Sequence, residues 1–316
     1  MVETAPGRAA DAFCTNGCLR ALFRRARCPE KRFFDDMGKA RVWRVEMMPC
    51  QVITSRKNEI IKTAARLRDS ASFRREQNAF LAEGARLCAD AADSGLLIRA
   101  VFYTERAGEK YASYLDRIFP KAEQVYQIAD SVAELLGDTR QPQGVFCTAE
   151  LPKRAAASGI EKNGCYLALE EIQDPSNLGA VLRTAEALGV SGVVLAGSCC
   201  DPYGAKALRA GMGAVFRLPL YYEENLALCV RRLRGQNFFT AAAVPAEDAL
   251  PITGVSFPPA VLLAVGNEGA GLSRQAVAAC DARVTIPMLG RAESLNAASS
   301  AAILMWEIMR TRGRLE

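Results

Sequence analysis

Two loops near the C-terminus place glycine, carboxylate and amide residues directly after apolar segments. The first reads Gly-Asn-Glu-Gly-Ala-Gly-Leu over 266–272 and follows the apolar run 261–265. Its three glycines let backbone N–H and C=O groups approach a ligand closely, and Glu268 is its only carboxylate. A sharp turn from a strand into a helix would use the same residue types. This loop alone therefore does not decide between ligand binding and a simple turn.

The second loop reads Ile-Pro-Met-Leu-Gly over 286–290 and follows an expected strand at 283–286. Pro287 ends that strand and leaves carbonyl groups without ladder partners. We expect Ser294 to cap the last helix and Asn296 to lie in its first turn. Open α/β sheets bind ligands at the carboxyl ends of their strands, so both loops lie where a ligand would bind.

A third cluster reads Asn-x-Gly-x-x-x-Arg-Thr-Ala from residue 177. Ser176 or Asn177 is expected to cap a helix here, and Arg183 follows Gly179 by one turn. The missing side chain at Gly179 leaves room for something large to approach. Arg183 is either a functional cation or a surface arginine paired with Glu186 on the same face.

The chain of 316 residues contains no histidine. This excludes Ser-His-Asp triads, Cys-His dyads and histidine-ligated metal sites. Any general base must be Asp, Glu, Lys, Tyr or a group borrowed from the substrate. The C-terminal half also lacks a G-x-G-x-x-G fingerprint and a P-loop lysine motif, which argues against a dinucleotide-dependent oxidoreductase.

The composition, half hydrophobic and a quarter charged, is that of an ordinary soluble protein. No apolar run reaches the roughly 20 residues that cross a bilayer, and the first residues do not have the layout of a secretory signal. Eleven cysteines, an odd number spread through apolar segments, indicate reduced thiols and a cytoplasmic protein. The spacing of Cys14, Cys18, Cys28 and Cys50 is irregular for zinc, and we expect no metal.

The net charge of +5 is concentrated near the N-terminus, because residues 1–47 contain ten basic and six acidic residues. Nucleic-acid binding by the rest would need a local patch. Residues 1–47 show no sustained period. We expect them to be a poorly ordered extension, or translated sequence upstream of a true start at Met47 or Met48.

Apolar periodicity predicts two α/β parts after this extension. The first, 52–150, alternates helices and strands and is expected to be a small sandwich. Its strands are expected at 97–103, 123–128 and 144–149, and its helices at 83–92, 110–119 and 130–136. Ser55 is expected to cap its first, basic helix, whose cations form either a solvated face or an RNA contact. Polar residues 151–163 are expected to form a linker.

The second part, 164–316, alternates strands and helices as a mostly parallel sheet with helices on both faces does. Strands are expected at 165–169, 192–196, 238–242, 261–265 and 283–286, and helices at 178–188, 201–210 and 224–233. The last helix is apolar nearly all round, so we expect it to be buried or to lie in an interface.

Together, in this order and spacing, the three clusters resemble the SpoU (TrmH-like) family of RNA ribose 2′-O-methyltransferases, part of the SPOUT superfamily. The resemblance covers roughly residues 52–312. The segment 201–214 also resembles the family, with Gly211 where a serine is more usual. The first part resembles the family's substrate-binding module, including Ile-Thr-Ser-Arg at 53–56 and Gln-Gly-Val at 143–145.

The resemblance implies an enzyme that uses S-adenosylmethionine and whose C-terminal segment forms a deep trefoil knot, an exception to the rule that folds are unknotted. It places the cofactor on backbone groups of Gly266, Ile286 and Leu295, with Met288 and Gly271 in the same loops. It also implies a homodimer whose last helix packs across the interface. A separate N-terminal module favours ribosomal RNA, most of all 23S ribosomal RNA, over transfer RNA as the substrate.

The same resemblance gives roles to five side chains. Arg183 would act with an RNA phosphate to orient the ribose hydroxyl and assist proton loss, while Asn177, Glu268, Ser294 and Asn296 position Arg183 and the substrate. A guanidinium is effectively always protonated, so we favour an electrostatic role over literal proton abstraction. A non-catalytic RNA-binding relative is the alternative, and it would be expected to have lost Asn177, Arg183 or Glu268.

Overall fold

The computed structural model describes residues 33–34, 40–41, 51–291 and 294–313. The chain divides into two compact units, 1–51 and 52–316. Within residues 1–50, the structure describes only the antiparallel strands β1 (Phe33–Phe34) and β2 (Ala40–Arg41). The expectations about residues 1–47 and about the four irregularly spaced cysteines therefore lie outside the described residues.

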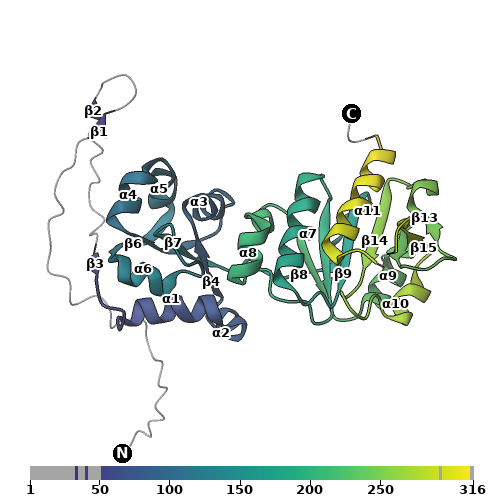
Figure 1. Cartoon of the computed structure of the whole chain (residues 1–316), viewed down its shortest axis with the longest axis horizontal. Coiled ribbons are helices and arrows are strands. Elements are labelled where there is room, and N and C mark those ends of the chain that lie inside the picture. The colour runs from purple at the N-terminus through teal and green to yellow at the C-terminus, as the bar shows by residue number, and fades with distance from the viewer. Residues whose placement is uncertain (1–32, 35–39, 42–50, 292–293, 314–316) are drawn as a thin grey trace, which may run out of the picture. The chain divides into compact units, whose positions relative to one another are not determined.

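The second unit contains two sheets (Figure 1). The N-terminal sheet has five strands in the order β3-β6-β5-β7-β4. These are β3 (Gln51–Ile53), β4 (Ala79–Glu83), β5 (Ile98–Tyr103), β6 (Ala122–Ile128) and β7 (Val145–Glu150). β5 runs parallel to β6, whereas β7 is antiparallel to both β5 and β4. The three strands expected here are present, each within a residue or so of its expected bounds.

Helices cover both faces of this sheet (Figure 1). They are α1 (Glu59–Asp69), α2 (Ala71–Gln77), α3 (Ala85–Asp93), α4 (Glu105–Lys110), α5 (Ala112–Ile118) and α6 (Asp130–Leu136). α1 and α6 bury Ile61 and Leu136 against one face, and α3 and α5 bury Cys88 and Ile118 against the other. The expected small α/β sandwich is confirmed.

The expected cap of α1 at Ser55 is wrong. The side chain of Asn58 accepts the Ile60 N–H at 2.9 Å and starts the helix. Ser55 instead accepts the Lys57 N–H, in the turn before the helix. Asparagine is as good a cap as serine, and Asn58 directly precedes Glu59, whose negative charge favours the first turn.

The C-terminal sheet has eight strands in the order β13-β15-β12-β14-β9-β10-β11-β8, and every pairing is parallel. They are β8 (Ala155–Ala156), β9 (Gly164–Glu170), β10 (Gly192–Ala196), β11 (Leu220–Glu223), β12 (Phe239–Ala243), β13 (Leu250–Pro251), β14 (Ala260–Val265) and β15 (Ala282–Thr285). The expected parallel sheet is confirmed. The polar segment 151–163 supplies its edge strand β8, and β11 was not expected.

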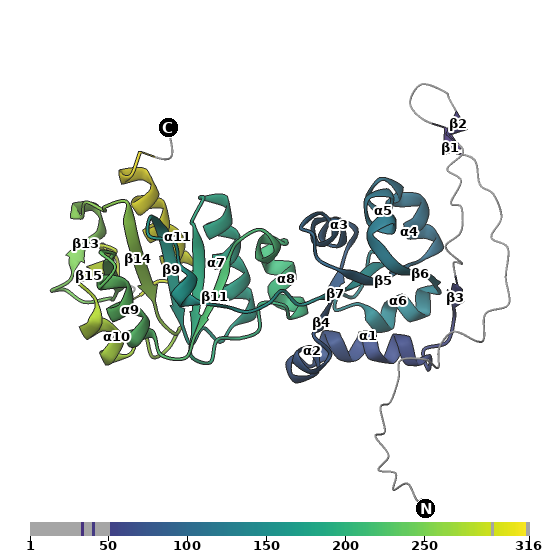
Figure 2. The ribbon, with the colours of Figure 1, turned by 180° about the vertical axis from the view of Figure 1, so that it is seen from behind.

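Helices α7 (Pro175–Ala187) and α11 (Ala297–Thr311) pack on one face of this sheet, and α9 (Leu226–Arg234) and α10 (Arg274–Ala279) pack on the other (Figure 2). Alternate residues of β9 supply the two cores, as the period of a strand requires. Leu167 lies in the core with α7, and Tyr166 in the core with α9. Helix α8 (Ala205–Gly211) packs against α7.

In the part of the chain that the structure describes, no helix is both long and apolar enough to span a bilayer. None of the seven cysteines within that part forms a disulfide bond. Among the described residues, no three Cys, Asp or Glu side chains lie close enough together to hold a metal ion.

Candidate active site

The loops that follow β9, β10, β14 and β15 leave the same edge of the sheet, because all these strands run parallel. Glu170 at the end of β9 is in register with Ala196 at the end of β10, and Leu169 is in register with Val265 at the end of β14. This edge is where open α/β sheets bind ligands. All three sequence clusters therefore converge on it.

Three side chains that are far apart in the sequence are joined by hydrogen bonds at this edge. The Asn177 Nδ2 donates to Glu268 Oε1 at 3.0 Å, and the Asn296 Nδ2 donates to Asn177 Oδ1 at 3.0 Å. Asn177 lies in the first turn of α7, Glu268 in the loop after β14, and Asn296 at the start of α11. One amide therefore links the loops that carry the three clusters, and we call these three residues the amide–carboxylate bridge.

The Glu268 carboxylate also accepts two backbone N–H groups, from Gln173 at 3.3 Å and from Asp174 at 3.2 Å. Burial acts to raise the pKa of Glu268, but the hydrogen bonds from Asn177 and from these N–H groups outweigh it, and the pKa falls below its ordinary value. Glu268 is therefore ionised at neutral pH and acts as an acceptor. It fixes the orientation of the Asn177 amide, whose oxygen then faces Asn296.

The glycine-rich loop after β14 folds tightly back on itself. A Cβ at Gly266 would lie 2.1 Å from the Gly271 carbonyl carbon and 2.2 Å from the Leu272 nitrogen. Asn267 and Gly271 exchange backbone hydrogen bonds at 3.1 and 2.9 Å, and Gly271 has a φ of +69°. Only glycine fits the first position, and the left-handed φ favours it at the last. The exposed backbone of the loop is therefore held in one fixed shape.

Asn267 stabilises this loop, although we did not single it out as a site residue from the sequence. Its Oδ1 accepts the N–H groups of Gly269 and Ala270, each at 2.9 Å, and its Nδ2 donates to the Glu171 carbonyl at 2.8 Å. These bonds tie the loop after β14 to the loop after β9. The position of Asn267 between a glycine and a carboxylate in the same motif was the signal that could have identified it.

Both helix caps expected at the site are wrong. Asp174 caps α7 by accepting the Ser176 N–H at 2.6 Å, because Pro175 occupies the first helical position and sets the start upstream. This leaves the Asn177 side chain available for Glu268. Asn296 caps α11 by accepting the N–H groups of Ala298 and Ser299, whereas Ser294 lies exposed two residues before it.

Arg183 is exposed on α7 and makes no hydrogen bond or ion pair with any residue that the structure describes. It lies six residues after Asn177, which is about 9 Å further along the helix axis. Its alternative partner, Glu186, accepts a hydrogen bond from Arg217 Nε at 2.8 Å instead. The structure does not bring Arg183 into the amide–carboxylate bridge, and it leaves the guanidinium open to solvent.

The space at Gly179 is filled by helix α8 and not by a ligand. A Cβ at Gly179 would lie 2.5 Å from the Ala207 carbonyl oxygen and 2.7 Å from Ala210 Cβ. A Cβ at Gly211 would lie 3.3 Å from the Gly179 oxygen. The two glycines therefore let α7 and α8 approach closely.

The remaining residues expected to bind a cofactor lie in the loops around β15 and α11. β15 ends at Thr285, and residues 286–289 continue without regular secondary structure. Ile286 is half-buried, whereas Met288 and Leu295 are exposed. Exposed large apolar side chains on a loop are the residue types that line small-molecule sites.

Two family models match the chain. Residues 164–306 match the SpoU rRNA Methylase family, and residues 58–147 match the MRM3-like substrate binding domain. The matched ranges correspond to the C-terminal and N-terminal sheets.

Whole-chain comparisons agree with these models. An uncharacterized tRNA/rRNA methyltransferase of Synechocystis is 30% identical over 264 residues, which cover 82% of this chain and 93% of the relative. The 23S rRNA (guanosine(2553)-2′-O)-methyltransferase RlmP of Bacillus subtilis is 28% identical over 256 residues, or 81% of this chain and 98% of the relative. The crystal structure of an AdoMet-bound rRNA methyltransferase from Sinorhizobium meliloti superposes with a TM-score of 0.74 at 29% identity, covering 84% of this chain and 99% of that one. The motifs that first suggested the family are thus set in its two-part architecture, and the chain belongs to the SpoU rRNA methylase family.

Proposed function

We propose that the chain transfers a methyl group from S-adenosylmethionine to a ribose 2′-hydroxyl of RNA, with 23S ribosomal RNA as the favoured substrate. The observation that carries the proposal is the bridge in which Asn177 joins Glu268 and Asn296. It ties together, in one site, the three motifs that distinguish the family. The relative RlmP is named as a 23S rRNA 2′-O-methyltransferase, and its match to this chain covers nearly the whole length of RlmP.

The loops fit S-adenosylmethionine. Gly266 and Gly271 carry no side chains, so at these two positions no side chain covers the backbone groups that a polar ligand would bind. Met288 and Leu295 present apolar surface of the kind that a purine ring covers. We propose that the backbones of Gly266, Ile286 and Leu295 hold the cofactor and that this C-terminal segment is knotted. When bound, S-adenosylmethionine supplies a methyl carbon activated by the adjacent sulfonium.

The protein must then align the hydroxyl and help its proton leave. Arg183 is the best candidate to grip an RNA phosphate, since its guanidinium has no partner among the described residues and is suited to bidentate phosphate contacts. We assign it an electrostatic role, because it does not deprotonate in proteins. Asn177, Glu268, Ser294 and Asn296 position the substrate, and Glu268, held ionised, is an acceptor.

Asn177→Ala is expected to lower methyl transfer about 10- to 100-fold, because it removes both hydrogen bonds that join Glu268 to Asn296 and leaves the two loops free to shift. The measurement is the rate of transfer of labelled methyl groups into RNA. Asn225→Ala is the matched control, since Asn225 caps α9 away from the bridge. Full activity in Asn177→Ala would show that the bridge is dispensable.

We propose that residues 52–150 bind the RNA, that 151–163 connect the two parts, and that 164–316 perform the transfer. The match of 58–147 to a substrate-binding domain supports the first assignment. Two cations of α1 are already engaged, since Lys62 pairs with Glu59 and Arg68 with Asp69. This favours a mostly solvated face for α1. We further propose that the protein acts in the cytoplasm.

We also propose that the protein is a homodimer through α11. Ile303 and Trp306 are 41% and 52% exposed on that helix, and they lie about one turn apart on one face. Trp306→Glu is expected to shift the protein from dimer to monomer, measured by sedimentation, because it buries a charge in the contact. Leu228→Glu on α9, where Leu228 is 57% exposed, should leave the dimer intact. A Trp306→Glu protein that stays dimeric would exclude α11 from the interface.

The test of the proposed function is transfer of labelled methyl groups from S-adenosylmethionine into separated ribosomal and transfer RNA pools. Labelling of ribosomal RNA is the expected result. Labelling of transfer RNA alone would make the protein a transfer-RNA enzyme. If the protein binds the cofactor but transfers no methyl group to either RNA pool and none to partly assembled ribosomal particles, the non-catalytic RNA-binding alternative is favoured.

A further inference from the structure

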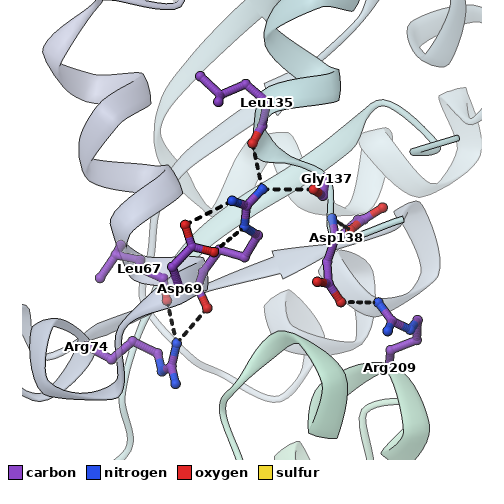
Figure 3. Close-up of polar contacts among 9 residues, drawn as sticks. Leu67, Asp69, Arg74, Leu135, Gly137, Asp138 and Arg209 are labelled. Carbon is purple, nitrogen blue, oxygen red and sulfur yellow. Dashed lines mark hydrogen bonds and ion pairs between the residues drawn. The ribbon is translucent and has the colours of Figure 1, made fainter. Parts of the chain in front are cut away.

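A partly buried ion pair joins the N-terminal sheet region to the loop before α8. The Arg74 side chain on α2 is only 5% exposed, and its Nε donates to Asp201 Oδ2 at 2.7 Å. Its Nη1 donates to the carbonyls of Leu67 and Arg68 at 2.7 and 2.9 Å (Figure 3). The other Asp201 oxygen accepts the Tyr203 N–H at 2.9 Å. Both charges are thus paired and hydrogen-bonded, which is what allows the Arg74 guanidinium to be buried.

Two more arginines make the same kind of connection nearby. Arg209 on α8 pairs with Asp138, which follows α6 (Figure 3). Arg217 donates through Nη1 to Asp90 on α3 at 3.4 Å and through Nε to Glu186 on α7 at 2.8 Å. Arg217 therefore bonds to the N-terminal part and to the helix that carries Arg183.

Aromatic side chains also connect the two parts. The ring of Phe80 on β4 lies 5.2 Å from that of Tyr203 and 5.7 Å from that of Phe216, measured between centroids. The aromatic contacts and the three ionic contacts all involve the same stretch of the C-terminal part, residues 201–217. We call this stretch the coupling segment.

The opposite side of the coupling segment contacts the candidate site. Helix α8 packs on α7 at Gly179, where no side chain would fit between the two backbones. Lys206 on α8 donates to Asp174 Oδ1 at 3.2 Å, and the Asp174 N–H donates to Glu268. The coupling segment therefore contacts the N-terminal part on one side, and on the other it contacts α7 and the cap residue Asp174, which in turn bonds to Glu268.

We propose that the coupling segment fixes the RNA-binding part in one register relative to α7, and that Arg74, Arg209 and Arg217 are positioning residues for methyl transfer. This rests on the proposed function. RNA bound by residues 52–150 presents its hydroxyl to a site on the other sheet, and a misplacement of about 1 Å can cost about 100-fold in rate. Three arginine bridges and an aromatic contact on one short segment supply that registration.

The test is the double variant Arg209→Gln/Arg217→Gln in the full chain, because both side chains are partly exposed and their loss should not prevent folding. The control is Arg234→Gln, which removes a comparably exposed ion pair, with Asp281, inside the C-terminal part. In the double variant, kcat at saturating ribosomal RNA is expected to fall at least about tenfold. The Kd values for RNA and S-adenosylmethionine should stay within about twofold, and the control should match wild type.

Arg74 provides an independent variant. Arg74→Lys keeps a cation beside Asp201 and should retain more of kcat than Arg74→Ala, at temperatures where both are folded. A rise in the RNA Kd with a weaker salt dependence and unchanged kcat would make these arginines phosphate contacts and overturn the proposal. So would an unchanged kcat in the double variant.

A structural readout separates this inference from the proposed function. Small-angle scattering of the double variant, without RNA, is expected to show a larger radius of gyration than wild type and Arg234→Gln. If the wild type transfers no methyl group, the proposed function fails, yet the scattering result still tests the coupling. Identical scattering of the double variant and wild type would show that the arginines do not fix the two parts.

Discussion

Arg183→Ala is expected to lower methyl transfer by about 10²- to 10³-fold while leaving the Kd for S-adenosylmethionine unchanged, the size of loss typical for one aligned donor. The loss is expected because Arg183 is the proposed phosphate contact. Its guanidinium is exposed and has no ion-pair partner among the described residues. Its removal therefore costs the fold little. Arg183→Lys should be intermediate, because it keeps the charge and loses the planar fork that grips phosphate.

The matched control is Arg231→Ala, which removes another exposed arginine, on α9. Kinetics with ribosomal RNA at saturating cofactor separate the two variants. Near-wild-type kcat in Arg183→Ala would remove Arg183 from the catalytic group and leave the amide–carboxylate bridge as the centre of the site. Equal losses in both variants would indicate a general effect of surface charge on RNA binding.

Gly266→Ala is expected to weaken S-adenosylmethionine binding by at least about 100-fold, equivalent to about 2.7 kcal/mol. The new Cβ would lie 2.1 Å from the Gly271 carbonyl carbon, so the loop must open to accept it, and overpacking of this kind costs about 1–3 kcal/mol or more. Calorimetric titration with the cofactor measures the effect. Methyl transfer should fall in parallel at fixed cofactor concentration.

The control for this variant is Gly254→Ala, since a Cβ at Gly254 meets nothing within 4 Å. Circular dichroism should show the same helix and strand content in both proteins. Unchanged cofactor affinity in Gly266→Ala would mean that the loop after β14 does not form the binding surface.

Local patterning predicted much of the C-terminal sheet. The strands β9, β10 and β14 are short apolar runs buried on both faces, and such runs followed by loops and helices predict parallel strands. β11 was missed because its sequence, Leu-Tyr-Tyr-Glu, has neither a long apolar run nor a clean alternation of apolar and polar residues. In the structure all four residues are half-buried. The two-residue edge strand β8 forms only by pairing with β11, and no local signal marks it.

The caps show why the site could be predicted only in part. Asp174, Ser176 and Asn177 are all good cap residues, so the sequence offers several equivalent starts for α7. Asp174 is the cap because Pro175 occupies the first helical position, and this leaves Asn177 to bond Glu268, 91 positions away in the sequence. Similarly, Gly179 was correctly predicted to leave room, but its neighbour is α8 rather than a ligand. The partner of Asn177 and the neighbour of Gly179 are set by contacts between residues far apart in the sequence, and short-range pattern does not contain them.

The most direct test of the central claim is the chemical position of the transferred methyl group. Ribosomal RNA methylated by the purified protein with labelled S-adenosylmethionine would be digested to nucleosides and analysed by mass spectrometry. If the methyl group is on the ribose 2′-oxygen, the label stays with the ribose when the glycosidic bond breaks, and the methylated position resists alkaline cleavage. Label on the base would contradict ribose 2′-O-methylation, however well the protein binds its cofactor.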